Sequence, residues 1–243
     1  MLLCYCGTAF GWGKSGHDAI AYIAECNLTP RAKRNIARYL DHSIVYYASW
    51  MDKYRDTPEF RNVEHVSYVD ADMQLVDTLR KGKTNCVVEL MHAIDRLKDY
   101  RNMSDSLVRL NLMYVIHIVG DMHCPSHVKY PGCKSGRADL NGKKMSYHAM
   151  WDWGVLDGAH GWSYSEYRLL LDTFSKREKA AMAKGTPREW LHETAVACRV
   201  IYDWQRADGT YGKQFVTDTY LLPERQLILA SYRLAAVLND LFG

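Results

Sequence analysis

Histidines and aspartates recur at metal-ligand spacing in the middle of this chain. In the run LMYVIHIVGDMHCPSH, His117 and Asp121 are four residues apart, which places them on one face of a predicted helix. His148 and Asp152 repeat the spacing in the run SYHAMWD. Imidazole nitrogens and carboxylate oxygens are ligands of zinc, and burying several carboxylates without a cation is costly. The two pairs therefore favour a metal site.

Further donors of the same kinds lie outside these two pairs. His127 follows the first pair after a predicted break in the helix at Gly120, Asp121 and Pro125. Upstream, Asp52 lies in ASWMDKYR, His65 in VEHVSYVD and His17 in WGKSGH. A lone histidine is more often a hydrogen-bonded core residue, and one His–Asp pair needs no metal. Two pairs and a third histidine beyond the break together favour a site for several ions.

The elements that must position these donors are mainly helices. Apolar residues recur at helical spacing, and Thr29-Pro30 is typical of a helix start. No alternating strand pattern of useful length occurs, and residues 131–144 predict a loop or short hairpin. We expect one all-α, mainly helical domain over residues 12–243. Its predicted helices are Gly16–Glu25, Pro30–Leu40, Val87–Tyr100, Ser106–Val119, Glu189–Ala207 and Pro223–Leu241.

Composition excludes several other classes of protein. The chain has 243 residues, of which 48% are hydrophobic and 24% charged, as in a globular protein with a sizeable core. The net charge of +3 excludes a histone-like polycation. No apolar run reaches the roughly 20 residues that span a bilayer, so no integral membrane segment is expected.

Residues 1–11, MLLCYCGTAFG, predict a signal peptide that could be truncated. Small residues at its end fit cleavage before Trp12, so we expect a secreted or periplasmic protein. In an oxidising compartment Cys124 and Cys133 could form a disulfide across a short loop, and Cys86 with Cys198 is a weaker pairing. Free buried thiols are the alternative.

Four runs and one isolated histidine occur in the order found in one enzyme family. In chain order they are WGKSGH, ASWMDKYR, His65, HIVGDMHCPSH and HAMWD. Over about residues 12–242 the chain resembles the trinuclear-zinc, single-strand-specific nucleases of the fungal S1/P1 type, which include the plant bifunctional nucleases. The resemblance implies the helical fold shared with phospholipase C. It also implies an enzyme that hydrolyses single-stranded DNA and RNA to 5′-phosphate products and removes phosphate from 3′-nucleotides.

The same resemblance implies three zinc ions with assigned ligands. The first set is Asp52, His65, His117 and Asp121. The second set is His127, His148 and Asp152. The third set is His17, the bridging Asp121 and the α-amine and carbonyl of Trp12, an amine that exists only after cleavage before Trp12. His123 is expected to support His127 or Asp121 without binding metal.

The resemblance assigns catalysis to Asp52 and Arg55. Asp52 would orient the attacking water, and Arg55 would bind phosphate. Family members place an aromatic residue directly after the equivalent of His65, where this chain has Val66. The candidate residues for stacking on a base are Tyr68, Tyr130 and Tyr147, and packing in the core or at a rim is the alternative for each.

Two other functions remain open at the level of sequence. A zinc-dependent phospholipase C has a similar fold and metal set, although those enzymes tend to end the set with Glu where this chain has Asp152. A non-catalytic protein stabilised by zinc is the third reading, and the surplus of donors near Arg55 argues against it. A monomer is favoured.

Overall fold

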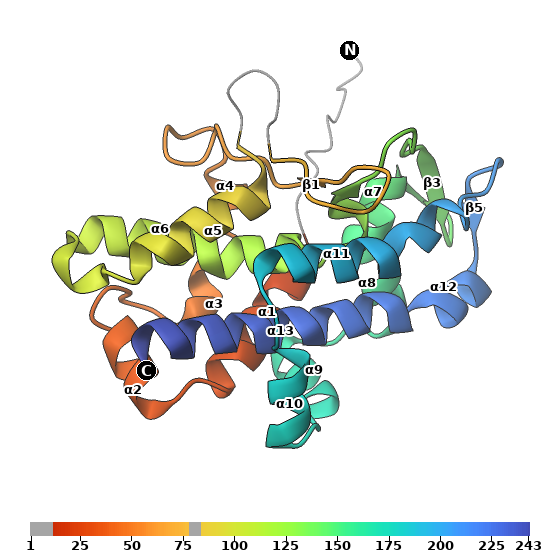
Figure 1. Cartoon of the computed structure of the whole chain (residues 1–243). Coiled ribbons are helices and arrows are strands. Elements are labelled where there is room, and N and C mark those ends of the chain that lie inside the picture. The colour runs from red at the N-terminus through yellow and green to blue at the C-terminus, as the bar shows by residue number, and fades with distance from the viewer. Residues whose placement is uncertain (1–11, 78–83) are drawn as a thin grey trace, which may run out of the picture.

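The computed structural model describes residues 12–77 and 84–243. Helices make up most of it and strands are short, so the predicted mainly helical fold class is confirmed. Figure 1 shows the long helix α13 (Leu221–Phe242) crossing the molecule, with α1 (Lys14–Cys26) and α11 (Pro187–Cys198) beside it. The largest hydrophobic core lies among these helices, α5 and α6.

The central helix is α6 (Asp105–Asp121), which packs along α5 (Cys86–Leu97). Ser104 caps its first turn by accepting a hydrogen bond from the backbone N–H of Leu107. From Asn111 onward every residue of α6 is buried, because the helix is apolar on all sides. A helix surrounded in this way can hold polar groups at its last turn away from solvent.

The remaining helices are short and cover this core. Several begin with Ser or Thr caps, and α9, α10 and α11 each have a capping box with a glutamate three residues on. They are α2 (Pro30–Ile36), α3 (Ile44–Tyr47), α4 (Trp50–Lys53), α7 (Tyr147–Ala149), α8 (Val155–Ala159), α9 (Tyr164–Leu171), α10 (Lys176–Met182) and α12 (Lys213–Thr219).

Two small sheets complete the described part of the chain. β1 (Ser67–Tyr68) pairs in parallel with β2 (Val128–Lys129). β3 (Arg137–Leu140) pairs with β4 (Lys143–Ser146) as a hairpin and with β5 (Thr210–Tyr211) in parallel. The hairpin turn is Asn141-Gly142, and both residues have the positive φ that a two-residue turn needs. The short hairpin predicted in 131–144 is therefore present, extended to Ser146, at the end of the molecule opposite α2.

All six predicted helices correspond to observed ones, with three differences of extent. Val87–Tyr100 ends at Leu97, and a 3₁₀ turn over Tyr100–Asn102 follows. Glu189–Ala207 was expected as one helix, but α11 ends at Cys198 and a 3₁₀ turn over Arg199–Tyr202 follows. Pro30–Leu40 ends earlier, at Ile36. Residues 147–159 were not predicted as helical, because a π-helical turn over Met150–Gly154 separates α7 from α8 and breaks the regular apolar spacing.

The cysteines of the described residues are all free, so the two disulfides considered from the sequence are wrong. The thiol of Cys124 donates a hydrogen bond to Asp152 instead, and Cys86 pairs with Ser67 at 3.1 Å. Cys4 and Cys6, like the whole predicted signal peptide, lie outside the described residues.

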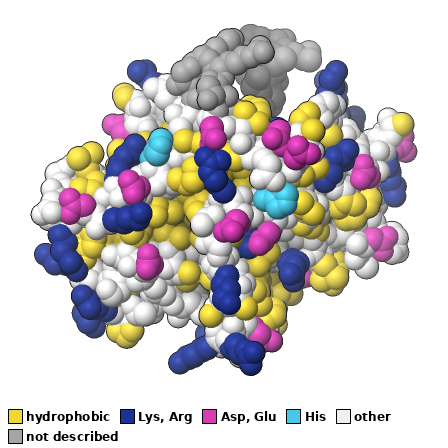
Figure 2. Space-filling model, viewed as in Figure 1, with side chains coloured by type: hydrophobic (Ala, Val, Ile, Leu, Met, Phe, Trp, Pro, Cys, Tyr) yellow, Lys and Arg dark blue, Asp and Glu magenta, His cyan; other side chains and the backbone are white. Residues whose placement is uncertain are grey.

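Surface features agree with the composition. Within the described ranges, no helix combines the length and apolar character needed to cross a membrane. On the face shown in Figure 2, basic and acidic side chains are interspersed, which fits the small net charge.

Candidate metal centre

Eight side chains predicted to bind metal meet at one place in the fold, although 135 positions separate the first from the last (152 − 17). They come from α1, α4, α6, the segments just before β1 and β2, α7, and the π-helical turn that follows α7. The most accessible of them exposes 17% of its side chain. They are His17, Asp52, His65, His117, Asp121, His127, His148 and Asp152.

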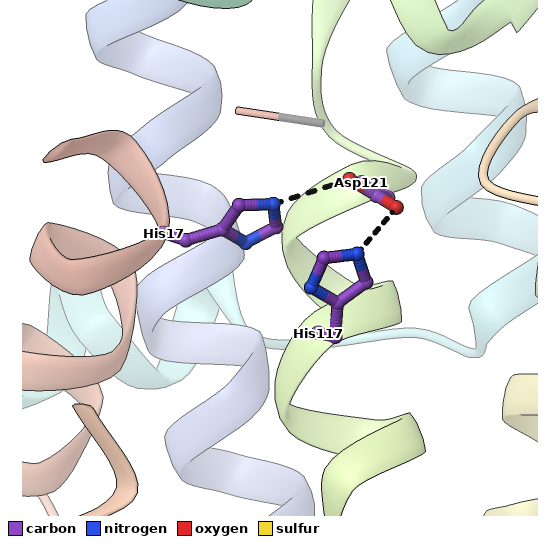
Figure 3. A group of neighbouring side chains, drawn as sticks. All are labelled: His17, His117 and Asp121. Carbon is purple, nitrogen blue, oxygen red and sulfur yellow. Dashed lines mark ion pairs between the residues drawn. The ribbon is translucent and has the colours of Figure 1, made fainter. Parts of the chain in front are cut away.

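Asp121, the last residue of α6, lies at the middle of this group. Its Oδ1 is 3.3 Å from Nε2 of His17, and its Oδ2 is 3.0 Å from Nε2 of His117. Figure 3 shows the carboxylate between these two rings, one from α1 and one from α6. Oδ2 is also 3.0 Å from Nδ1 of His65, and Oδ1 is 3.4 Å from Nδ1 of His127. Asp121 can therefore bridge two cations.

Asp52 approaches the same group from α4. Its Oδ1 is 3.4 Å from Nδ1 of His65 and 3.9 Å from Nε2 of His117. Arg55, one turn further on, places Nη2 3.3 Å from the same oxygen. Asp52 and Arg55, the two residues predicted to act in catalysis, thus lie next to each other at the edge of the centre.

His148 and Asp152 form the second pair, on the helical segment that begins at α7. Nε2 of His148 is 3.2 Å from Oδ2 of Asp152, and Nε2 of His127 is 3.2 Å from Oδ1. The two imidazoles stack with ring centroids 4.9 Å apart. The π-helical turn that contains Asp152 is a kind of distortion that is frequent at functional sites.

Backbone carbonyls fix the orientation of three of these imidazoles. A carbonyl oxygen can only accept, so each Nδ1 must carry the proton, which leaves Nε2 as a lone pair facing the centre. Nδ1–H of each ring donates to a backbone carbonyl oxygen. His117 donates to Ala48 at 2.7 Å, His127 to His65 at 2.7 Å and His148 to Ser126 at 3.1 Å.

Several buried atoms in the centre have no hydrogen-bond partner among the described residues. They are Nε2 of His17, His65 and His127, and Oδ1 of Asp121. An unpaired buried polar group costs about 1–3 kcal/mol, so such a cluster is rare in a protein core. Cations between these lone pairs would satisfy them, and the donor set therefore fits metal.

The carboxylates and imidazoles also shift one another's protonation. Although burial lowers it, the carboxylates of Asp121 and Asp52 raise the pKa of His117 to about 9. Burial likewise opposes a rise in the pKa of His127, yet Asp121 and Asp152 bring it to about 9. Despite burial, His117 and His127 hold the pKa of Asp121 well below its usual range. Protons and cations would therefore compete for the same nitrogen atoms.

Three groups of donor atoms lie close enough to hold an ion, each with all atoms within 4.8 Å of one another. The predicted first and third sets of ligands overlap two of these groups. The groups are His17 with His117 and Asp121, Asp52 with His65 and His117, and Cys124 with His127 and Asp152.

Trp12 and Gly120 set the distance between α1 and α6. The indole N–H of the buried Trp12 donates to the carbonyl of Gly120 at 2.8 Å, which brings residue 12 next to Asp121 in the fold. A Cβ on Gly120 would lie 2.9 Å from Nδ1 of His17. Glycine at this position therefore allows His17 to reach the centre.

Sequence reasoning assigned no role to Ser126 and considered Cys124 only as a disulfide partner of Cys133. Cys124 and Ser126 donate to Oδ1 of Asp152, at 3.2 Å and 2.7 Å, and so hold the carboxylate in place. Burial and Asp152 raise the pKa of the Cys124 thiol well above its usual range, so it acts as an S–H donor in the metal-free centre. Their position between two predicted ligands in HCPSH was the available signal.

His123 does not contact His127 or Asp121 in the way expected from the sequence. Its Nδ1–H donates to the carbonyl of Val119, and its Nε2 accepts from the buried Arg233 of α13 at 2.8 Å. Burial and Arg233 lower the pKa of His123 to about 3, which keeps the ring neutral. His123 therefore ties the turn after α6 to α13.

None of the three tyrosines predicted as stacking candidates presents its ring to the solvent-accessible side of the metal centre. Tyr130 and Tyr147 are buried, and their hydroxyls donate to the carbonyls of Ala195 and Ile201, so stacking on a base is wrong for both. Tyr68 is half-buried in β1 and does not line the cleft beside His65.

A polar cleft gives access to the centre. It has a volume of about 450 Å³, and His65, His127 and His148 form part of its wall. Its charged side chains are the basic Arg55, Arg61 and Lys129 and the acidic Asp56 and Glu64, so basic groups are in slight excess. An anionic substrate can therefore reach the buried donors from this side.

The chain is similar in sequence to several plant and fungal nucleases. Endonuclease 2 of Arabidopsis thaliana is 26% identical over 96% of this chain and 91% of its own length. Nuclease S1 of Aspergillus oryzae is 28% identical over 74% of this chain and 67% of its own. Nuclease P1 of Penicillium citrinum is 25% identical over 96% and 98%.

The family model for S1/P1 Nuclease matches residues 12–243, which includes every one of the eight converging side chains. The match favours the nuclease over the phospholipase C and the non-catalytic protein considered from the sequence. This chain belongs to the S1/P1 nuclease family and is a nuclease.

Proposed function

We propose that this nuclease is a zinc-dependent phosphodiesterase. It hydrolyses single-stranded DNA and RNA to 5′-phosphate products, and it also hydrolyses 3′-nucleotides. The observation that carries the proposal is the set of buried, unpaired imidazole and carboxylate atoms around Asp121, next to the guanidinium of Arg55. Such donors need cations, and an arginine at their edge suits an anionic ester.

Three zinc ions are assigned to the centre on the basis of these donors. Asp52, His65, His117 and Asp121 would hold the first, and His127, His148 and Asp152 the second. His17, Asp121 and the amine and carbonyl of Trp12 would hold the third. The oxygen and nitrogen atoms suit zinc, and Asp121 has an oxygen facing each of two rings.

Zinc, when bound, supplies Lewis-acid activation of water and of the phosphate oxygens. Asp52 orients the attacking water and takes up its proton, and Arg55 donates hydrogen bonds to the phosphate. Water attacks phosphorus, the bond from phosphorus to the 3′ oxygen breaks, and a proton passes to that oxygen. We assign the leaving 3′ oxygen to the side of His127 and His148, which line the polar cleft. The products carry a 3′-hydroxyl and a 5′-phosphate.

Burial of the centre supports the preference for single strands. Asp121 and His117 are completely buried, and other donors reach solvent through the clefts beside Arg55. A backbone within a stacked duplex cannot turn into such a recess, whereas an unpaired strand can bend and separate its bases.

Export completes the centre in this proposal. Trp12 carries an amide nitrogen in the full chain, and only removal of residues 1–11 gives the free amine that binds metal. We therefore propose a secreted or periplasmic monomer that begins at Trp12. An uncleavable extension before Trp12 should lower the zinc content and the activity, and full activity with three zinc ions in that variant would refute the coupling.

Metal analysis combined with an activity assay tests the proposed function. Protein beginning at Trp12 should contain about three zinc ions and cleave denatured DNA and RNA much faster than duplex DNA. A chelator should abolish cleavage, and added zinc should restore it. Undiminished cleavage after complete removal of metal, or hydrolysis of phosphatidylcholine in preference to nucleic acid, would contradict the proposal.

A further inference from the structure

A second, larger cleft adjoins the polar cleft at Arg55 and Asp56. Its volume is about 1000 Å³, and Asp52 of the metal centre forms part of its wall. The rest is formed by the start of α1, by α3 and the segment around α4, and by Trp153, α8 and the start of α9. A nucleic-acid strand whose phosphate lies at Arg55 can therefore place one neighbouring nucleotide in each of the two clefts.

The two clefts differ in their aromatic content. The larger one is lined by Trp50, Trp153, Tyr46 and Tyr164, and the two tyrosines are 54% and 40% exposed. The polar cleft has Phe60 as its aromatic residue, and that ring is buried. Bases stack on accessible aromatic rings, so the larger cleft is the one equipped to bind a base.

Trp153 is the aromatic residue whose position is most closely tied to the metal centre. It directly follows Asp152 in the π-helical turn and is half-buried. Its Cβ packs on Gly13, where an added Cβ would come within 2.6 Å, and Nζ of Lys143 lies 4.2 Å from its ring centroid. The ring is thus held in place before any ligand binds.

Charges in the larger cleft balance rather than accumulate. Lys14 pairs with Asp18, and Ser15 donates to Asp157. Against the basic residues Lys14, Lys53 and Arg55 stand the acidic residues Asp18, Asp52, Asp56 and Asp157. A run of phosphates would meet no net attraction, whereas one base and its sugar fit an aromatic wall without excess positive charge.

We propose that this larger cleft, which we call the Trp153 cleft, binds the base on the 3′ side of the scissile phosphate. This inference rests on the proposed function, which places the leaving 3′ oxygen, and hence the 5′-side nucleotide, beside His127 and His148. The nucleotide that keeps the phosphate must then continue across Arg55 in the other direction. Stacking on Trp153 therefore promotes cleavage of a strand and plays no part in hydrolysis of a 3′-nucleotide.

Three dinucleotide substrates test the inference with the zinc-loaded enzyme. The first has both bases, the second lacks the base on the 3′ side, and the third lacks the base on the 5′ side. Loss of the 3′-side base should lower kcat/KM of the unaltered enzyme roughly tenfold, because a stacked base is lost. In Trp153→Ala, loss of the 3′-side base should lower kcat/KM by about twofold or less. The two enzymes and the two substrates form a double-mutant cycle that isolates the contact between Trp153 and this base. The effect of removing the 5′-side base should be equal in both enzymes.

Two further variants keep the result interpretable. Trp153→Phe retains a ring and should restore most of the preference. Phe174→Ala removes a 39% exposed aromatic residue that does not line the cleft, and it should behave as the unaltered enzyme. Equal thermal stability and zinc content confirm that Trp153→Ala is folded.

The possible failures are distinguishable. If the unaltered enzyme cleaves none of the dinucleotides or longer strands, the proposed function itself fails. If it cleaves them but Trp153→Ala keeps the full preference for the 3′-side base, the inference is overturned. An equal loss of preference for the bases on both sides would overturn it as well.

Discussion

The two His–Asp pairs of this nuclease have the same spacing but different surroundings. At Asp121, the Oδ1 atom has no hydrogen-bond partner among the described residues, and the imidazoles of His17 and His117 stack 4.3 Å apart beside it. At Asp152, the corresponding Oδ1 already accepts from Ser126 and Cys124. A cation is therefore needed to satisfy the first end of the centre, whereas protein donors partly satisfy the second.

Accessibility differs between the deepest ligands of the two ends. His17 and His117 lie in the core, whereas His148 lines the polar cleft, which the buried His127 and His65 of the Asp121 end also line. Ions held by Asp121 would therefore contribute to the stability of the fold, and the ion at Asp152 would exchange more readily with solvent. Spacing in the sequence predicts a pair but not how strongly that pair depends on metal.

Replacing Asp121 should have the largest effect. Asp121→Asn keeps the shape but removes the charge shared by two sites, so about two zinc ions should be lost. Activity should fall by roughly a thousandfold or more, because the centre no longer stabilises charge on the phosphate. Metal analysis and cleavage of denatured DNA measure both effects. A variant with three zinc ions and normal turnover would rule out the bridging role.

Stepwise chelation should remove zinc from the Asp152 end of the centre before it removes zinc from the Asp121 end. The ion at Asp152 should leave at a lower chelator concentration and cost little stability. Loss of ions at Asp121 should follow and lower the melting temperature strongly, since lone pairs are then left buried. Metal occupancy and thermal unfolding at each chelator concentration check the order, and earlier loss from Asp121 would reverse the comparison.

Ser126→Ala should weaken the Asp152 end alone. Groups that hold a metal ligand in place commonly contribute 10–100-fold to affinity, so we expect about a tenfold loss of zinc at Asp152. Cys124→Ser is the matched control, because it retains a donor to the same oxygen and should have a smaller effect. Competition with a chromophoric chelator measures the affinities. Equal losses at both ends would show that Ser126 acts on the whole centre.

The pH dependence of stability should differ between metal-free and zinc-loaded protein. The pKa values of His117 and His127 are raised to about 9 in the metal-free fold, above the ordinary value of 6.5. Their contribution is therefore complete below pH 6.5 and is lost as the pH rises through about 9. Zinc needs neutral imidazoles, so the loaded protein should instead lose stability as the pH falls. Melting temperatures between pH 5 and 10 should thus change in opposite directions by a few degrees, and parallel profiles would contradict this.

The sequence predicted the long elements well, for a physical reason. α1, α6 and α13 bury regular apolar faces, and helical spacing reports such faces directly. The π-helical turn around Asp152 escaped prediction because its hydrogen bonds follow no regular period. Periodicity reports that a face is buried but not what packs against it.

The same limit applies to the site. Ligand types and spacing singled out the two His–Asp pairs, because metal chemistry restricts which residues can serve, and the family resemblance selected the other four of the eight converging side chains. The supporting roles of Ser126 and Cys124, and the burial of Tyr130 and Tyr147, depend on contacts between segments distant in sequence. Hydroxyl and thiol groups have many uses, so their residue types alone assign no role.

Anomalous diffraction at the zinc absorption edge tests the central claim most directly. Crystals of protein that begins at Trp12 should give three strong peaks within the group formed by Asp121, Asp152 and their histidines. One peak should lie between His17 and Asp121, one beside His65 and one between His148 and Asp152. Density without anomalous peaks at this group, or peaks at other surfaces, would contradict a zinc centre built from these residues.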